Sequence, residues 1–96
     1  MATYLLASID VKDVERYDRD YVPGVGPLIQ KHGGRVLIAT DKVDVLEGQW
    51  PPGRVIVIEF PDADAAKAWY SDPEYQPLVK IRFETSEGLL AFVDGV

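Results

Sequence analysis

The sequence predicts one α+β domain in which a four-stranded antiparallel sheet carries its helices on one face, in the order β-α-β-β-α-β. Three observations lead to this prediction. Four segments have the residue pattern of strands, two regions between them have helical periodicity, and 96 residues are too few to divide into two cores. We therefore expect a single domain over residues 1–96.

The four strands are expected at residues 3–10, 35–40, 54–60 and 88–94. The third, RVIVIEF, is the clearest, because it is dense in β-branched residues and is followed by Pro61. A strand extension or small hairpin is also expected at residues 43–47, before the chain-breaking loop GQWPPG.

Two helical regions are expected between the strands. Asp13 is a suitable N-cap for the first, which the segment Pro23–Pro27 should break into two pieces and Gly33-Gly34 should end. Asp62 should cap the second region, and Asp72-Pro73 should start a further helix within it.

The predicted strands are apolar on both faces, and this predicts association. In strand 54–60, Ile56 and Ile58 point one way while Val55 and Val57 point the other. With the helices on one face, the other would be a large exposed apolar patch, which monomers rarely tolerate. A homodimer that covers this face is the simplest solution.

The composition excludes several classes of function. A net charge of -6, with basic residues scattered along the chain, argues against nucleic-acid and anionic-membrane partners. With no cysteine and one histidine, neither a disulfide framework nor a usual zinc site can form, so we expect no metal and no cofactor. The beginning of the chain has no signal-peptide pattern, and a cytoplasmic location is expected.

Several motifs resemble one known family over nearly the full length. They are YLLASIDVKD, HGGRVL, VLEGQWPPGRVIVIEFPDADAAKAWYSDPEYQPL and the ending LLAFVDGV. In this order they resemble the DUF1330 family, which is similar to the dimeric α/β-barrel superfamily with its ferredoxin-like subunits. Members of that superfamily include cofactor-independent monooxygenases, muconolactone isomerase-like enzymes and haem-handling relatives. The resemblance implies a ferredoxin-like fold, pairing as a dimeric α/β barrel, and a cleft between sheet and helices.

Two residues are candidates for catalysis. Glu59 lies in the most hydrophobic strand, where a carboxylate either forms an ion pair or hydrogen bond or has a raised pKa. It is therefore a candidate base or substrate anchor. The alternative is a structural ion pair with Arg35. His32, at the end of a helix, is a candidate general acid or base, and the alternative is an interaction with the helix-end carbonyls.

The aromatic residues predict a binding site for a flat organic ligand. Tyr17, Tyr21 and Trp69 are the expected cleft-lining residues, with Arg35 and Glu59 as polar partners. The same rings fall on the predicted core stripes, so simple packing is the alternative. Trp50, in a proline-rich loop, is expected at the rim of the dimer.

Three functions remain open from the sequence. The first is a cofactor-independent monooxygenase- or isomerase-like enzyme acting on an aromatic or enolisable compound. The second is a non-catalytic module that binds a ligand in the same cleft. The third is a domain whose role is to dimerise.

Overall fold

The computed structural model describes residues 1–96 and has an α+β, ferredoxin-like architecture. The elements are, in order, β1 (Thr3–Val11), α1 (Val14–Arg16), the π-helical turn η1 (Tyr17–Tyr21), α2 (Val22–Lys31), β2 (Arg35–Thr40), β3 (Arg54–Phe60), α3 (Ala63–Ser71), α4 (Gln76–Thr85) and β4 (Ser86–Asp94). The four predicted strands are all present, and the first and last are longer than expected by one and two residues. No helix is long and apolar enough to cross a lipid bilayer.

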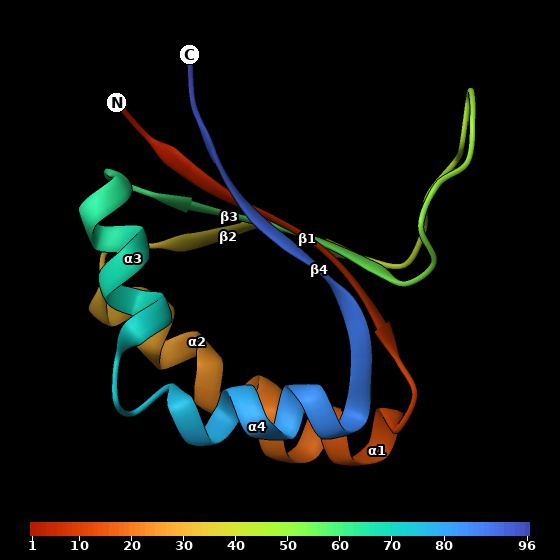
Figure 1. Cartoon of the computed structure of the whole chain (residues 1–96), viewed down its shortest axis with the longest axis horizontal. Helices are drawn as coiled ribbons and strands as arrows, with labels where there is room; N and C mark the ends of the chain where they lie inside the picture. The colour runs from red at the N-terminus through yellow and green to blue at the C-terminus, as the bar shows by residue number, and fades with distance from the viewer.

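The sheet has the strand order β2-β3-β1-β4, and every neighbouring pair is antiparallel. Figure 1 shows all the helices on one side of this sheet. Alternate residues of β1 and β3 face these helices and are buried, among them Leu5, Ile9, Ile58 and Phe60. The core therefore lies between one face of the sheet and the helical layer.

The first helical region is continuous, where the sequence predicted a break at Pro23–Pro27. The chain stays helical from Val14 to Lys31, and the irregularity is the π turn η1, in which the Val22 N–H donates to the Tyr17 carbonyl. Pro23 follows this turn, in the first turn of α2, where a missing N–H costs little. The helix changes direction at η1 (Figure 1), as expected where a π turn interrupts the α-helical ladder.

Gly33 and Gly34 end α2 as predicted. Gly33 has a positive φ of 76°, and its N–H donates to the Gln30 carbonyl at 3.0 Å. The Gly34 N–H donates to the Ile29 carbonyl at 2.9 Å. These two bonds form a Schellman motif, which satisfies the last carbonyls of the helix and turns the chain into β2.

The two helices of the second region begin differently. Asp62 caps α3 as predicted, because its carboxylate accepts from the Ala65 N–H at 2.8 Å. The expected restart at Asp72-Pro73 is wrong by a few residues. Residues 73–75 form a turn and α4 begins at Gln76, while Asp72 caps the end of α3 and its side chain accepts from the Glu74 N–H at 2.8 Å.

Residues 41–53 contain no strand, so the expected extension at 43–47 is wrong. The segment is an exposed arm that projects away from the body (Figure 1), and apolar residues in it find no partner strand. The arm returns to the sheet where the Ser8 hydroxyl donates to the Pro52 carbonyl at 3.0 Å. Gly53 has a φ of 116° there, and a Cβ atom at this position would collide with the backbone of Ile9.

The face of the sheet opposite the helices, which we call the open face, is apolar and uncovered. Leu6, Ile38, Leu89 and Val93 lie on it, and each of them is exposed, Leu89 by 62%. This is the arrangement that the two-sided apolar pattern of the strands predicted.

Candidate functional site

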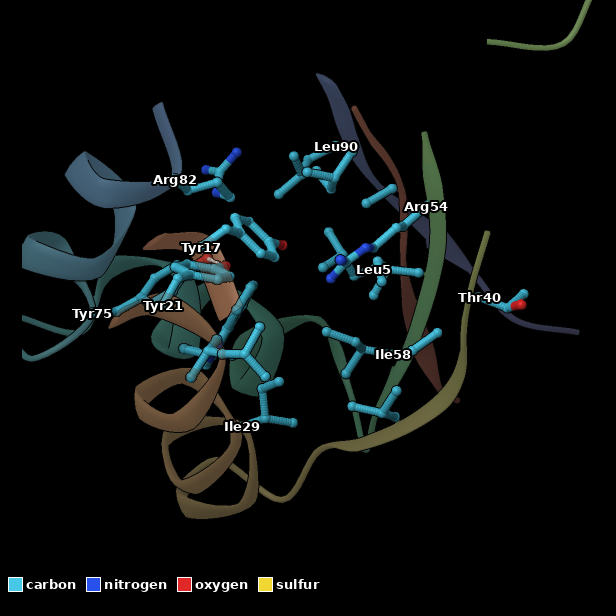
Figure 2. A pocket seen from close by; sticks show the side chains of 18 of the residues that line it. Leu5, Tyr17, Tyr21, Ile29, Thr40, Arg54, Ile58, Tyr75, Arg82 and Leu90 are labelled. Carbon is cyan, nitrogen blue, oxygen red and sulfur yellow. Dashed lines mark hydrogen bonds between the residues drawn. The ribbon is translucent and has the colours of Figure 1, made fainter. Parts of the chain in front are cut away.

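A cleft lies between the sheet and the helical layer. It has a volume of about 410 Å³, and 15 of its 19 lining residues are hydrophobic. Figure 2 shows its side chains converging from β1 and β3 on one side and from η1, α2 and α4 on the other. Its size and its apolar walls are those of a small-molecule site.

The π turn η1 supplies two of the cleft's tyrosines. Tyr17 and Tyr21 are four residues apart, both are buried, and their ring centroids lie 4.9 Å apart. A π turn widens the helix locally, so the spacing of these two residues around the helix differs from that in a regular α-helix. Both residues lie on the wall of the cleft.

The junction of α3 and α4 supplies the other aromatic residues. Trp69, near the end of α3, packs against Tyr75 with ring centroids 4.6 Å apart and against Phe60 at 5.5 Å. The Trp69 side chain is buried, and its Nε1 has no hydrogen-bond partner within the protein. Trp69 and Tyr75 both line the cleft, so this donor belongs to a residue of the cleft wall.

The hydroxyls of Tyr21 and Tyr75 form a hydrogen bond of 2.6 Å in the buried part of the site. Burial raises the pKa of Tyr17, Tyr21 and Tyr75, because a phenolate would lose its hydration there. These phenols therefore stay protonated at neutral pH. They can donate hydrogen bonds to a ligand but are poor bases.

Two arginines border Tyr17 inside the cleft (Figure 2). Arg54 of β3 lies over the Tyr17 ring, 5.5 Å from its centroid, and donates to the Asp18 carboxylate at 2.9 Å. This hydrogen bond lowers the pKa of Asp18. The charge of Arg54 is thus matched by a carboxylate from η1.

Arg82 of α4 has no such match. Its residue is only 5% exposed, its Nε has no hydrogen-bond partner, and it forms no ion pair. Glu84, the nearest carboxylate along α4, contacts Arg16 at 3.6 Å. Sequence reasoning missed Arg82 as a site residue. Its position on the same helical stripe as Tyr75 and Val79 was the feature of the sequence that could have indicated it.

Of the residues that the sequence singled out, Tyr17, Tyr21 and Trp69 come together on the cleft wall, whereas Arg35 and Glu59 lie elsewhere. Arg35 Nε donates to Glu59 at 2.8 Å, and the Tyr4 hydroxyl donates to the other oxygen of Glu59 at 3.0 Å. Both bonds lower the pKa of Glu59, with that from Arg35 the larger cause. This ion pair matches the structural alternative, and it lies on the open face of the sheet.

His32 also lies outside the cleft lining. Its Nε2 is 2.7 Å from the buried carboxylate of Asp72, and its N–H donates to the Ile29 carbonyl at 3.2 Å. The catalytic roles of His32 and Glu59 thus stay predictions that the geometry of the cleft does not draw on. No group of three or more His, Cys, Asp or Glu side chains is arranged to hold a metal ion.

A family model described as "Domain of unknown function (DUF1330)" matches residues 2–96. A search of curated proteins found no match.

Solved structures share the fold. A protein of unknown function from Rhodopseudomonas palustris is 20% identical, with a TM-score of 0.80 over 99% of this chain and 82% of that one. SnoaB, a cofactor-independent oxygenase from Streptomyces nogalater, is 11% identical, with a TM-score of 0.69 over 99% and 93%. A dimeric ferredoxin-like protein of unknown function from Bacteroides fragilis is 16% identical, with a TM-score of 0.57 over 98% and 96%. At these identities the likeness concerns the fold alone.

Proposed function

This chain belongs to the DUF1330 family, and we propose from its cleft that it is a small-molecule enzyme of the cofactor-independent monooxygenase or isomerase type, acting on an aromatic or enolisable compound. The observation that carries the proposal is the cleft itself, about 410 Å³ in volume and walled by Tyr17, Tyr21, Trp69 and Tyr75. Flat rings bind such walls through apolar contact, and a few hydroxyls fix their orientation. The fold shared with SnoaB agrees with this class of activity.

The chemistry of both reaction types starts with the same step. A proton leaves a carbon next to a carbonyl group, and the negative charge moves to the carbonyl oxygen, which gives an enolate. Buried phenols that stay protonated stabilise such an oxyanion by donating hydrogen bonds in a site with little water. Asp41, on the wall of the cleft and exposed, is the carboxylate that we assign to accept the proton.

The two reactions differ in their second step. In an isomerase, the proton returns to a different carbon of the enolate. In an oxygenase, an activated methylene group loses two hydrogens and gains one oxygen atom from O₂, while the second oxygen atom leaves as water. The substrate supplies all four electrons, so neither reaction needs an external reductant.

Deuterium exchange tests the shared first step. Phenylpyruvate and phenylacetone both carry an acidic methylene group beside a flat ring, and its exchange in D₂O is followed by NMR. We expect the protein to accelerate exchange for at least one of them, and Tyr21→Phe and Tyr75→Phe to reduce the rate by about tenfold or more, as for other donors to an oxyanion. Tyr4→Phe is the matched control, because that hydroxyl is bonded to Glu59 outside the cleft.

The same samples separate the alternatives. Oxygen uptake in step with exchange identifies an oxygenase, and exchange without uptake identifies an isomerase. Binding of aromatic compounds without exchange favours the non-catalytic ligand-binding module and overturns the enzyme proposal.

We further propose that two copies pair through the open face of the sheet. Support comes from the exposed Leu6, Ile38, Leu89 and Val93 and from the dimeric state named for the Bacteroides fragilis structure. Light scattering at micromolar concentration should give the mass of a dimer. Leu6→Lys with Leu89→Lys should give a monomer, whereas Val14→Lys, a similar change at an exposed residue of α1, should not. A monomeric wild-type protein would refute the pairing.

A further inference from the structure

The position of Arg82 is costly for the empty protein. The Arg82 residue is only 5% exposed, and in proteins a charge at such a position is nearly always paired with a carboxylate. Here its Nε has no partner, and its side chain interacts only with neutral groups, the hydroxyl of Tyr75 and the ring of Phe83, which lies 4.9 Å from the guanidinium carbon. A cation–π contact of this kind compensates less than an ion pair does.

The charge of Arg82 is directed at the cleft. Arg82 lines the cleft from α4, on the side where Figure 2 shows Tyr17. Its field favours the ionised form of Tyr17, Tyr21 and Tyr75 alike, which places it within electrostatic reach of all three phenols. A second buried donor without a partner, Nε1 of Trp69, belongs to the same wall.

Arg54 is the other arginine of this cleft, and its charge is paired with a carboxylate. It also lines the wall, but it is bonded to Asp18 at 2.9 Å. Asp41, the carboxylate on the cleft wall, acts on Arg54 as well, so Arg82 is the cleft arginine that no carboxylate matches. An anion is the ligand group that such a charge selects.

We propose that the cleft takes a flat aromatic compound carrying one oxyanion, a carboxylate or an enolate, and that Arg82 is the residue that receives this oxyanion. The inference rests on the cleft of the proposed function and deepens it, because it names the charge of the substrate. The aromatic part lies among the rings of Tyr17, Trp69 and Tyr75. The tyrosine hydroxyls add hydrogen bonds to the same oxyanion.

The first test compares two ligands of the same shape. Calorimetric titration of the full chain with 1-naphthoate and 1-naphthamide measures what the negative charge adds. We expect the carboxylate to bind about 10- to 100-fold more tightly than the amide, the range that hydrogen bonds to charged groups supply. Equal affinity, or tighter binding of the amide, overturns the assignment of a carboxylate.

Three variants localise the effect. Arg82→Met should abolish the preference for naphthoate while leaving naphthamide binding within about twofold, and Arg82→Lys should keep part of the preference. Lys80→Met is the matched control, because it removes the same charge from the exposed side of the same helix, and the preference should survive in it. A preference that survives in Arg82→Met overturns the role of Arg82.

The stability of the empty variant gives a second readout. If Arg82 is kept for a ligand, Arg82→Met removes an unpaired buried charge, and the melting temperature should stay the same or rise. If Arg82 has a structural role, the melting temperature should fall. A fall in the empty protein therefore counts against the proposal even when the variant still binds.

A third ligand separates the enolate from the carboxylate. The ionised form of 4-nitrophenol is coloured, so its ionisation in the cleft is read directly by absorbance. At a pH where the free dye is mostly protonated, binding should colour it in the wild-type protein and not in Arg82→Met. Colour without naphthoate preference indicates a site for enolates only, and preference without colour a site for carboxylates only. Absence of both overturns the inference.

These outcomes are distinct from failure of the proposed function. Deuterium exchange at the neutral phenylacetone with no preference for anions would uphold the enzyme and refute the role of Arg82. Anion binding through Arg82 without exchange would do the reverse.

Discussion

Nε2 of His32 donates a hydrogen bond of 2.7 Å to the Asp72 carboxylate, and this contact ties the end of α2 to the turn between α3 and α4. Lys31 Nζ donates to the same oxygen at 2.9 Å, and the Glu74 N–H donates to the other at 2.8 Å. The carboxylate is buried and surrounded by donors. The pKa of Asp72 is therefore held well below its usual range, with the bond from His32 the largest cause.

The first prediction concerns acid stability. Because the pKa of Asp72 is lower in the folded chain than the 3.8 of a free side chain, its ionised form stabilises the fold fully above that pH. The stabilisation is lost as the pH falls below 3.8 toward the folded pKa. Asp72→Asn should lower the melting temperature at neutral pH by several degrees and remove part of the acid dependence.

Thermal melts followed by circular dichroism between neutral pH and about pH 3 measure both effects. Glu74→Gln is the control, because that exposed carboxylate contacts Lys31 only at 3.9 Å. If Asp72→Asn melts with the same acid slope as the wild-type protein, the slope comes from other carboxylates.

The elements that the sequence predicted well are those decided by neighbouring residues. Local hydrogen bonds fix the start of α3 at Asp62 and the end of α2 at Gly33-Gly34. The residue types at these positions were therefore enough to locate both helix ends. The strands followed from β-branched runs and from alternation. Tyr17, Tyr21 and Trp69 could be assigned to the cleft wall because helical spacing puts them on inward faces.

The remainder depends on contacts between distant segments. The π turn η1 keeps the chain helical ahead of Pro23, and no local pattern distinguishes this from a break. The stripe that contains Arg82 was visible, but a long cationic side chain often extends from such a stripe to water. Only the packing of α4 against η1 and β4 shows that Arg82 stays buried.

The second prediction concerns the paired hydroxyls of Tyr21 and Tyr75. Removing either one leaves the other hydroxyl buried without its 2.6 Å partner, so Tyr21→Phe and Tyr75→Phe should each destabilise the chain by about 1–2 kcal/mol. The double variant should lose less free energy of unfolding than the two single variants together, with a coupling of about 0.5–1.5 kcal/mol. Urea unfolding of the four proteins measures the coupling. Strictly additive costs would show that the two hydroxyls do not stabilise each other.

The third prediction concerns two glycines near or within α2. A Cβ atom on Gly34 would lie 2.7 Å from the Phe60 ring and 2.8 Å from the Ile29 side chain, so Gly34→Ala should destabilise by about 1–3 kcal/mol. Gly26 is in the helix, and a Cβ there meets nothing within 4 Å. Gly26→Ala should therefore stabilise by about 0.5–1 kcal/mol. Melting temperatures that move in the same direction for both would contradict this packing.

The last prediction tests the two interpretations of Glu59. Arg35 and the Tyr4 hydroxyl both bond to its carboxylate on the open face, so Arg35→Ala and Glu59→Ala should couple in a double-mutant cycle measured by urea unfolding. The coupling should weaken at high salt, because the Arg35 side chain is 71% exposed. The effects of Lys80→Ala and Glu59→Ala on the free energy of unfolding should be additive, because these two residues are not partners.

Turnover then decides the role of Glu59. A catalytic carboxylate predicts that Glu59→Gln abolishes deuterium exchange at phenylpyruvate or phenylacetone while the protein remains folded. A structural ion pair predicts a protein that is less stable at low salt but exchanges at the wild-type rate. We expect the second result, because Glu59 points away from the cleft and its two oxygens are already occupied by Arg35 and Tyr4. Loss of exchange in a folded Glu59→Gln protein would place the reaction on the open face, between the two copies of a dimer.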